Sequence, residues 1–110
     1  MLPFLEQQRD AVRSLCQRYG VRRLDVFGSA VTGRFDASKS DLDFIVSFVD
    51  RTPGTYADKY LNLAEALESL FSRKVDLVTE DSVRNPYFRE AIERTRQPIY
   101  EQQPTKEAAV

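Results

Sequence analysis

The chain has 110 residues, which is enough for one domain and too few for two ordinary ones. Its 16 Lys and Arg residues nearly balance 17 Asp and Glu residues, and because the two signs are interleaved, the sequence argues against a general nucleic-acid or membrane-surface binder. The absence of histidine and the presence of one cysteine exclude a Ser-His-Asp or Cys-His nucleophile, a zinc site of Cys and His ligands, and an internal disulfide within this chain.

The first half of the chain is predicted to form one helix and two strands. Apolar residues recur at close to helical spacing from 4 to about 19, and Gly20 follows where a helix would end. The lone Cys16 lies in this apolar stripe and is expected in the core. Residues 22–28 alternate in polarity and end in glycine, which predicts a strand. Residues 41–49 are dense in β-branched and aromatic residues and predict a second strand, with Leu42, Phe44, Val46 and Phe48 toward a core.

The middle of the chain is predicted to form a turn, a helix and a strand. A Pro-Gly pair within residues 50–55 indicates a turn. Apolar residues at helical spacing predict a helix over about 57–72. Residues 74–79 then have the pattern of a short strand.

The last part of the chain begins with a helix-start signal. Asn85 followed by proline predicts an N-cap and a helix over about 86–96. This helix is expected to bury Phe88, Ala91 and Ile92. Residues 98–100 predict an edge strand, because proline cannot donate to a ladder, and residues 101–110 are expected to form a flexible tail. The element order predicts one small α/β (α+β) domain over residues 1–100, with a mixed β-sheet packed against helices.

The sequence offers no sign of a membrane or secreted protein. No segment approaches the roughly 20 apolar residues that span a bilayer. Residues 1–6 lack the features of a secretory signal. We therefore expect a cytoplasmic protein.

A glycine-containing turn follows the first predicted strand. Gly28 and Ser29 come directly after the strand, and Gly33 follows soon after. Backbone N–H groups in such a turn can bind a phosphate, especially where a short helix begins. An ordinary tight turn would also account for both glycines.

Acidic residues open the second predicted strand. Asp41 and Asp43 project to the same side of it, and two adjacent carboxylates repel unless a cation such as Mg²⁺ lies between them. The alternative is a capping box formed by Ser40 and Asp43, which the strand-like residues that follow disfavour. Asp76 lies within the strand over 74–79 and either faces solvent or, if the strands are neighbours, joins the other two carboxylates in a two-cation site.

Some basic and aromatic residues near these motifs have two possible roles. Arg34 and Lys39, in the loop between the motifs, are placed either to neutralise phosphate charge or simply to be solvated. Arg22 and Arg23 are interpreted as surface charges. Three tyrosines could either pack within the protein or line a partner surface, and packing is expected for most of them: Tyr56, Tyr87 and Tyr100.

The two motifs together resemble a known family. Gly-Ser-Ala-Val-Thr-Gly at 28–33, followed after six residues by Ser-Asp-Leu-Asp-Phe-Ile-Val at 40–46, resembles the Gly-Ser…Ser-Asp-x-Asp signature of the DNA polymerase β-like nucleotidyltransferase superfamily. Over about residues 4–100 the chain is similar to the minimal nucleotidyltransferases, the MNT antitoxins encoded beside HEPN-domain toxins. This resemblance implies the nucleotidyltransferase fold, ATP as substrate, two Mg²⁺ ions, and transfer of AMP to a tyrosine of a HEPN ribonuclease.

The resemblance also implies a role for each matching residue. Gly28 and Ser29 would hold the phosphates, and Asp41 and Asp43 would bind magnesium. Asp76 matches the third carboxylate, which helps to hold one metal and can orient or deprotonate the acceptor hydroxyl. The remaining candidates for nucleotide binding are Gly33, Arg34, Lys39 and Ser40. The alternatives are an antitoxin that acts by contact alone, or transfer to a small molecule, which the short chain disfavours. The near-neutral charge fits a protein acceptor better than a nucleic acid.

Overall fold

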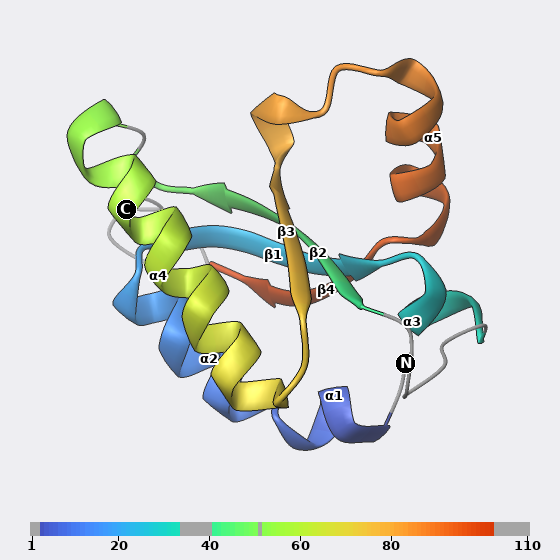
Figure 1. The fold of residues 1–110 in the computed structure, drawn as a ribbon, viewed down its shortest axis with the longest axis horizontal. Helices are drawn as coiled ribbons and strands as arrows, with labels where there is room; N and C mark the ends of the chain where they lie inside the picture. Colours follow the sequence, from blue (N-terminus) through green and yellow to red (C-terminus); the bar gives the residue numbers. More distant parts are fainter. Residues whose placement is uncertain (1–2, 34–40, 51, 103–110) are drawn as a thin grey trace, which may run out of the picture.

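A four-stranded mixed sheet forms the centre of the protein. In the computed structural model, which describes residues 3–33, 41–50 and 52–102, the strands are β1 Val21–Phe27, β2 Leu42–Phe48, β3 Val75–Thr79 and β4 Gln97–Glu101. Their order is β3-β2-β1-β4 (Figure 1). The β1 strand pairs antiparallel with β2 and β4, whereas β2 and β3 are parallel. The predicted mixed sheet, with the proline-containing strand at its edge, is confirmed.

Helices pack against both faces of this sheet. They are α1 Pro3–Gln7, α2 Arg9–Arg18, α3 Ser29–Thr32, α4 Pro53–Phe71 and α5 Pro86–Thr95, with a 3₁₀ turn, η1, at Glu80–Ser82. The α2 and α4 helices cover one face, and α5 lies against the other (Figure 1). Among the described residues, no helix combines the length and apolar character that crossing a membrane requires.

The main core lies between the sheet and the α2 and α4 helices. The four predicted inward residues of β2, Leu42, Phe44, Val46 and Phe48, are all buried there. Cys16 is also fully buried, and burial raises the pKa of its thiol to about 12, so it is an inert core residue as predicted. On the other face, Phe27, Ile45 and Ile92 form a smaller cluster. Successive β2 residues thus alternate between two differently covered faces.

Two predicted helix boundaries were wrong. The N-terminal helix is broken at Gln8, which redirects α1 so that Leu5 is buried and Phe4 packs on the core. The Pro-Gly pair at 53–54 forms the first turn of α4 instead of a separate turn. Proline suits that position because the first N–H of a helix has no internal partner.

The α5 helix begins as predicted but buries less. The Asn85 side chain accepts hydrogen bonds from the N–H groups of Tyr87 and Phe88. Ile92 is fully buried, but Ala91 is exposed and Phe88 is 42% exposed, which corrects the prediction for both. The reason is that α5 covers only a small patch of the sheet, where Phe88 meets Phe27 edge-on. Residue 101 ends β4, and 103–110 lie outside the described residues, so the predicted domain boundary and tail stay predictions.

Candidate active site

The acidic residues meet where β2 and β3 begin. The parallel register pairs Asp43 with Asp76, and the antiparallel register pairs Asp43 with Phe27, the residue before Gly28. Asp43 shares its face of the sheet with Ile45, the face opposite α2 and α4. The strands are therefore neighbours, as a shared site requires, and Asp76 and Asp43 lie side by side.

Gly28 lies directly against the Asp43 carboxylate. A Cβ atom at Gly28 would be 2.8 Å from Oδ2 of Asp43, and the backbone φ there is +76°. Both facts require glycine, because any side chain would strain the backbone and strike the carboxylate. Gly33 also has a positive φ and ends α3, and no atom of the described residues lies within 4 Å of where its Cβ would be, as for an ordinary helix-ending glycine.

The turn after β1 is tied to the end of α5. The Gly28 N–H donates to Oγ1 of Thr95 at 3.0 Å, and Thr95 donates to the Ala91 carbonyl at 3.1 Å. The Gly28 N–H therefore already has a hydrogen-bond acceptor within the protein. A phosphate at this turn would meet instead the amides of Ser29 and Ala30, because the first N–H groups of a helix such as α3 have no partner within it. Gly28, the residue directly before them, lies against the Asp43 carboxylate.

Asp43 holds its proton more tightly than a free aspartate does. Burial, followed by the charges of Asp76 and Asp41, raises the pKa of Asp43 from its usual 3.8 to about 6. Lys74 lies near Asp41, with Nζ 3.9 Å from Oδ2, but both side chains are well exposed and the pair is weak. Among the described residues, the site therefore has an excess of negative charge that a cation would offset.

A cation at this site would need ligands beyond the carboxylates of the described residues. Within the described residues, no group of three or more His, Cys, Asp or Glu side chains is gathered so as to hold a metal ion. Mg²⁺ commonly takes one or two carboxylates and completes its shell with substrate phosphates and water. The Asp43 and Asp76 pair fits that pattern. Three other predicted nucleotide-binding residues, Arg34, Lys39 and Ser40, lie outside the described residues.

A buried ion-pair network supports the site and was not predicted. Asp25 in β1 is fully buried, and its carboxylate accepts hydrogen bonds from Nε of Arg23, at 2.9 Å, and from Nε of Arg96. Arg96 also binds Glu80, to which Arg89 donates at 2.7 Å. Burial alone would raise the pKa of Glu80, but the hydrogen bonds from the two arginines outweigh it and lower that pKa. The network fastens η1 and the end of α5 to the sheet.

This network corrects one prediction about surface charges. Arg22 is exposed as predicted, but Arg23 is partly buried against Asp25. The available signal was an aspartate between Leu24 and Val26, within an apolar strand, because a buried charge needs a partner.

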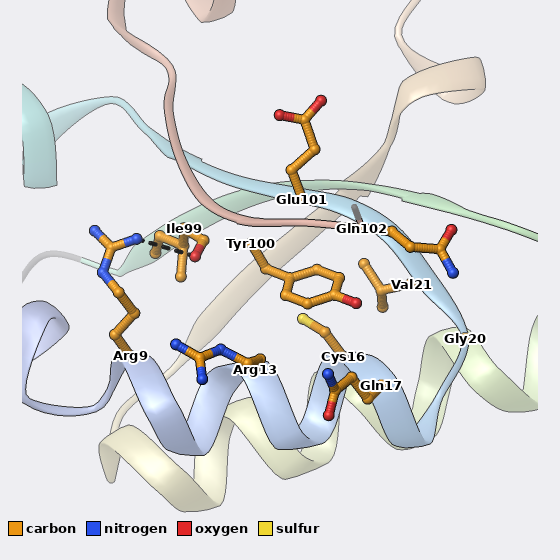
Figure 2. Close-up of a pocket in the computed structure, with 10 residues that line it drawn as sticks. All are labelled: Arg9, Arg13, Cys16, Gln17, Gly20, Val21, Ile99, Tyr100, Glu101 and Gln102. Atoms are coloured by element: carbon orange, nitrogen blue, oxygen red, sulfur yellow. Dashed lines mark hydrogen bonds between the residues drawn. The ribbon is translucent and has the colours of Figure 1, made fainter. Parts of the chain in front are cut away.

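A hollow on the α2 side of the sheet is not lined by the candidate site residues. It has a volume of about 710 Å³ between α2 and β4, where Arg9 reaches across to donate to the Ile99 carbonyl at 3.1 Å (Figure 2). None of the three predicted carboxylates lines it. Tyr100 lines this hollow and packs on the core, as Tyr56 does elsewhere, whereas Tyr87 is 82% exposed. Packing thus accounts for two of the three tyrosines, as predicted.

Known proteins are similar to this chain in sequence and in fold. The protein adenylyltransferase MntA of Thermococcus cleftensis is 38% identical over 73 residues, which cover 66% of this chain and 70% of that protein. A solved structure described as a "putative minimal nucleotidyltransferase" is 38% identical and superposes with a TM-score of 0.70, covering 86% of this chain and 91% of that one. A tri-AMPylated HEPN toxin of Shewanella oneidensis in complex with its MNT antitoxin matches with a TM-score of 0.63 at 18% identity, over 94% of this chain and 78% of that one, which shows a shared fold.

The family assignment rests on most of the chain. The family model described as "Nucleotidyltransferase domain" matches residues 8–99, a range that contains the glycine turn and all three aspartates. The predicted resemblance to the minimal nucleotidyltransferases is confirmed by the matches to named relatives and solved structures. The chain belongs to the nucleotidyltransferase domain family.

Proposed function

We propose that this nucleotidyltransferase transfers AMP from ATP to a tyrosine hydroxyl of a HEPN-domain toxin and thereby acts as its antitoxin in the cytoplasm. The observation that carries the proposal is the register pair of Asp43 and Asp76 beside Gly28. The name of the Thermococcus cleftensis relative supports protein adenylylation. The solved complex of an AMPylated HEPN toxin with its MNT antitoxin supports the choice of partner.

The residues have distinct roles in this proposal. Asp41, Asp43 and Asp76, together with substrate phosphates and water, would hold two Mg²⁺ ions, and these ions would neutralise phosphate charge and favour attack by a hydroxyl. The Ser29 amide binds the nucleotide phosphates, with Gly28 giving them room beside Asp43. The oxygen of the acceptor hydroxyl bonds to the α-phosphorus of ATP, and Asp76 accepts the proton of that hydroxyl. The bond between the α-phosphorus and the oxygen that bridges it to the β-phosphate breaks, and pyrophosphate leaves. Gly33, Arg34, Lys39 and Ser40 complete the predicted nucleotide-binding set.

Labelled ATP tests this proposal. The chain, MgCl₂ and the HEPN-domain protein proposed as its partner are incubated with ATP labelled at the α- or the γ-phosphate. We expect the HEPN protein to become labelled from the α-position only, and its ribonuclease activity to fall in step. Ribonuclease inhibition without label would instead support an antitoxin that acts by contact. Label on an added small hydroxyl compound, but not on protein, would support a small-molecule transferase.

Thr95 is expected to position the phosphate-binding turn. In Thr95→Val the Gly28 N–H loses its acceptor, which should cost about 1 kcal/mol of unfolding free energy and let the turn shift against Asp43. We expect AMP transfer to fall about tenfold, because small displacements of positioning groups slow reactions strongly. Thr95→Ser keeps the hydroxyl and should transfer at nearly the original rate. A Thr95→Val protein as active as Thr95→Ser would contradict this role.

A further inference from the structure

A groove runs along the outer edge of β3 and ends at the candidate active site. It has a volume of about 570 Å³ and lies between β3 and the first half of α4. Since β3 is the last strand of the sheet, this edge pairs with no other strand of the described chain. The lining residues are Tyr56, Ala57, Tyr60, Leu61, Asp76, Leu77, Val78, Thr79 and Ser82. We call this hollow the β3 groove; its Asp76 is the same residue that pairs with Asp43.

The outer edge of β3 is already capped by side chains. The Tyr60 hydroxyl donates to the Leu77 carbonyl, and the Ser82 hydroxyl donates to the Thr79 carbonyl at 2.9 Å. The Val75 N–H donates to Oε2 of Glu68 at 3.2 Å. A strand added along this edge would have to break these bonds, so strand addition is disfavoured. The groove is suited to side chains.

The chemistry of the groove changes along its length. Tyr60, Leu61 and Leu77 supply aromatic and aliphatic walls, and Asp76 supplies a carboxylate near the start of β3. Asp76 lines the same hollow as Tyr60 and Leu61, so the acidic residue and the apolar wall belong to one groove. A group with an apolar body and a hydroxyl end matches this distribution. A polyhydroxylated small molecule matches it poorly, because its hydroxyls would lose water against apolar walls.

We propose that the β3 groove seats the acceptor tyrosine of the partner protein, with its ring against Tyr60 and Leu61 and its hydroxyl directed to Asp76. This inference rests on the proposed function and adds to it the surface that selects the acceptor. Tyrosine fits because its ring gains from burial against apolar walls while its hydroxyl needs a hydrogen-bond acceptor. Because Asp76 both lines the groove and pairs with Asp43, a tyrosine bound in the groove would lie next to the site of AMP transfer.

A pair of equally exposed residues gives a matched test. Leu61 lines the groove and Val49 does not, and both are 56% exposed, so an aspartate at either should leave the fold intact. In Leu61→Asp we expect the KM for the HEPN protein to rise about tenfold or more, with kcat and Mg·ATP affinity unchanged. Val49→Asp should match the original chain in all three. Equal KM values for the two variants would overturn the proposal.

A binding measurement separates this inference from the proposed function. N-acetyl-tyrosinamide is titrated into the ¹⁵N-labelled chain, and we expect shifts of the amides of Leu61, Leu77 and Val78 that Leu61→Asp abolishes. If these shifts occur but no AMP is transferred, the groove binds the tyrosine side chain but the proposed transferase activity is refuted. If AMP is transferred but the amides of the groove do not shift, the proposal that the groove seats the acceptor tyrosine is refuted. Self-association that only Leu61→Asp abolishes, with the KM for the HEPN protein unchanged, would assign the groove to a second copy of the chain and also refute the proposal.

Discussion

The Asp43→Asn variant is expected to lose AMP transfer about a hundredfold or more while remaining folded. Asp43 lies between Asp76 and Gly28, so its charge affects both the proposed cations and the phosphates. Asparagine keeps the shape but removes that charge, and a lost electrostatic contact to a phosphoryl transition state has an effect of this size. The rate of labelling from α-labelled ATP measures it. Asp58→Asn, an exposed change on α4, should leave that rate unaltered.

The same variant is expected to gain stability above about pH 6 in a metal-free buffer with chelator. The folded state raises the pKa of Asp43 to about 6, so the ionised carboxylate opposes folding, and wild-type stability falls as pH rises from about 4 to 6. Asparagine avoids this loss, which should amount to about 1 kcal/mol after solvent screening of a partly exposed group. Below about pH 4 the two proteins should be equally stable.

Denaturant unfolding at several pH values tests this second effect. The gain of Asp43→Asn should be present at pH 7.5 and absent at about pH 3.5. A variant that is less stable than the original chain at pH 7.5 would show that Asp43 contributes to the fold and does not oppose it. The combination of lost activity with gained stability is what distinguishes a functional carboxylate from a structural one.

The Arg96→Met variant is expected to lose about 3–5 kcal/mol of unfolding free energy. Arg96 is 9% exposed, and without it the fully buried Asp25 carboxylate would lose its Arg96 hydrogen bond while Arg23, a partly exposed partner, remained. Arg94→Met is the matched control, because Arg94 is 71% exposed and, within the part of the chain that the structure describes, forms an ion pair only with Glu90. The control should change stability by less than about 0.5 kcal/mol. Urea denaturation measures both.

A double variant separates the buried charge from the packing. Asp25→Asn combined with Arg96→Met removes the buried charge together with its partner, so it should recover part of the stability lost in Arg96→Met alone. If Arg96→Met were as stable as Arg94→Met, the network would not hold α5 to the sheet. The account of Thr95 and Gly28 would then lose its support, since Thr95 precedes Arg96 at the end of the same helix.

Local sequence pattern was enough to predict most of the sheet. The β-branched run after Asp41 forms β2 with its predicted residues inward, and the proline-containing segment forms the edge strand β4. Asn85 caps α5 as its sequence indicates. These features depend on neighbours within a few residues, where side-chain alternation and capping act. That β3 lies beside β2, and in which register, depends on how α4 crosses between them, which no local pattern specifies.

The features that were missed depend on partners distant in the sequence. Asp25 and Arg96 are 71 residues apart, and Gly28 and Thr95 are 67 apart. The break at Gln8 follows from packing of Leu5 and Phe4 on the core and not from any helix-breaking residue. Conversely, the carboxylates could be proposed from the sequence because Asp41, Asp43 and the glycine turn occur close together in it. Only the position of Asp76 beside them could not be predicted without the strand order and register of the sheet.

Intact mass spectrometry of the partner tests the central claim most directly. The HEPN protein is incubated with ATP, MgCl₂ and either the original chain or Asp43→Asn, and its mass and ribonuclease activity are measured in the same samples. We predict a mass increase of whole AMP units, located on tyrosine by fragmentation, and loss of ribonuclease activity with the original chain alone. A HEPN protein that is inhibited equally by both chains, with its mass unchanged, would contradict the account.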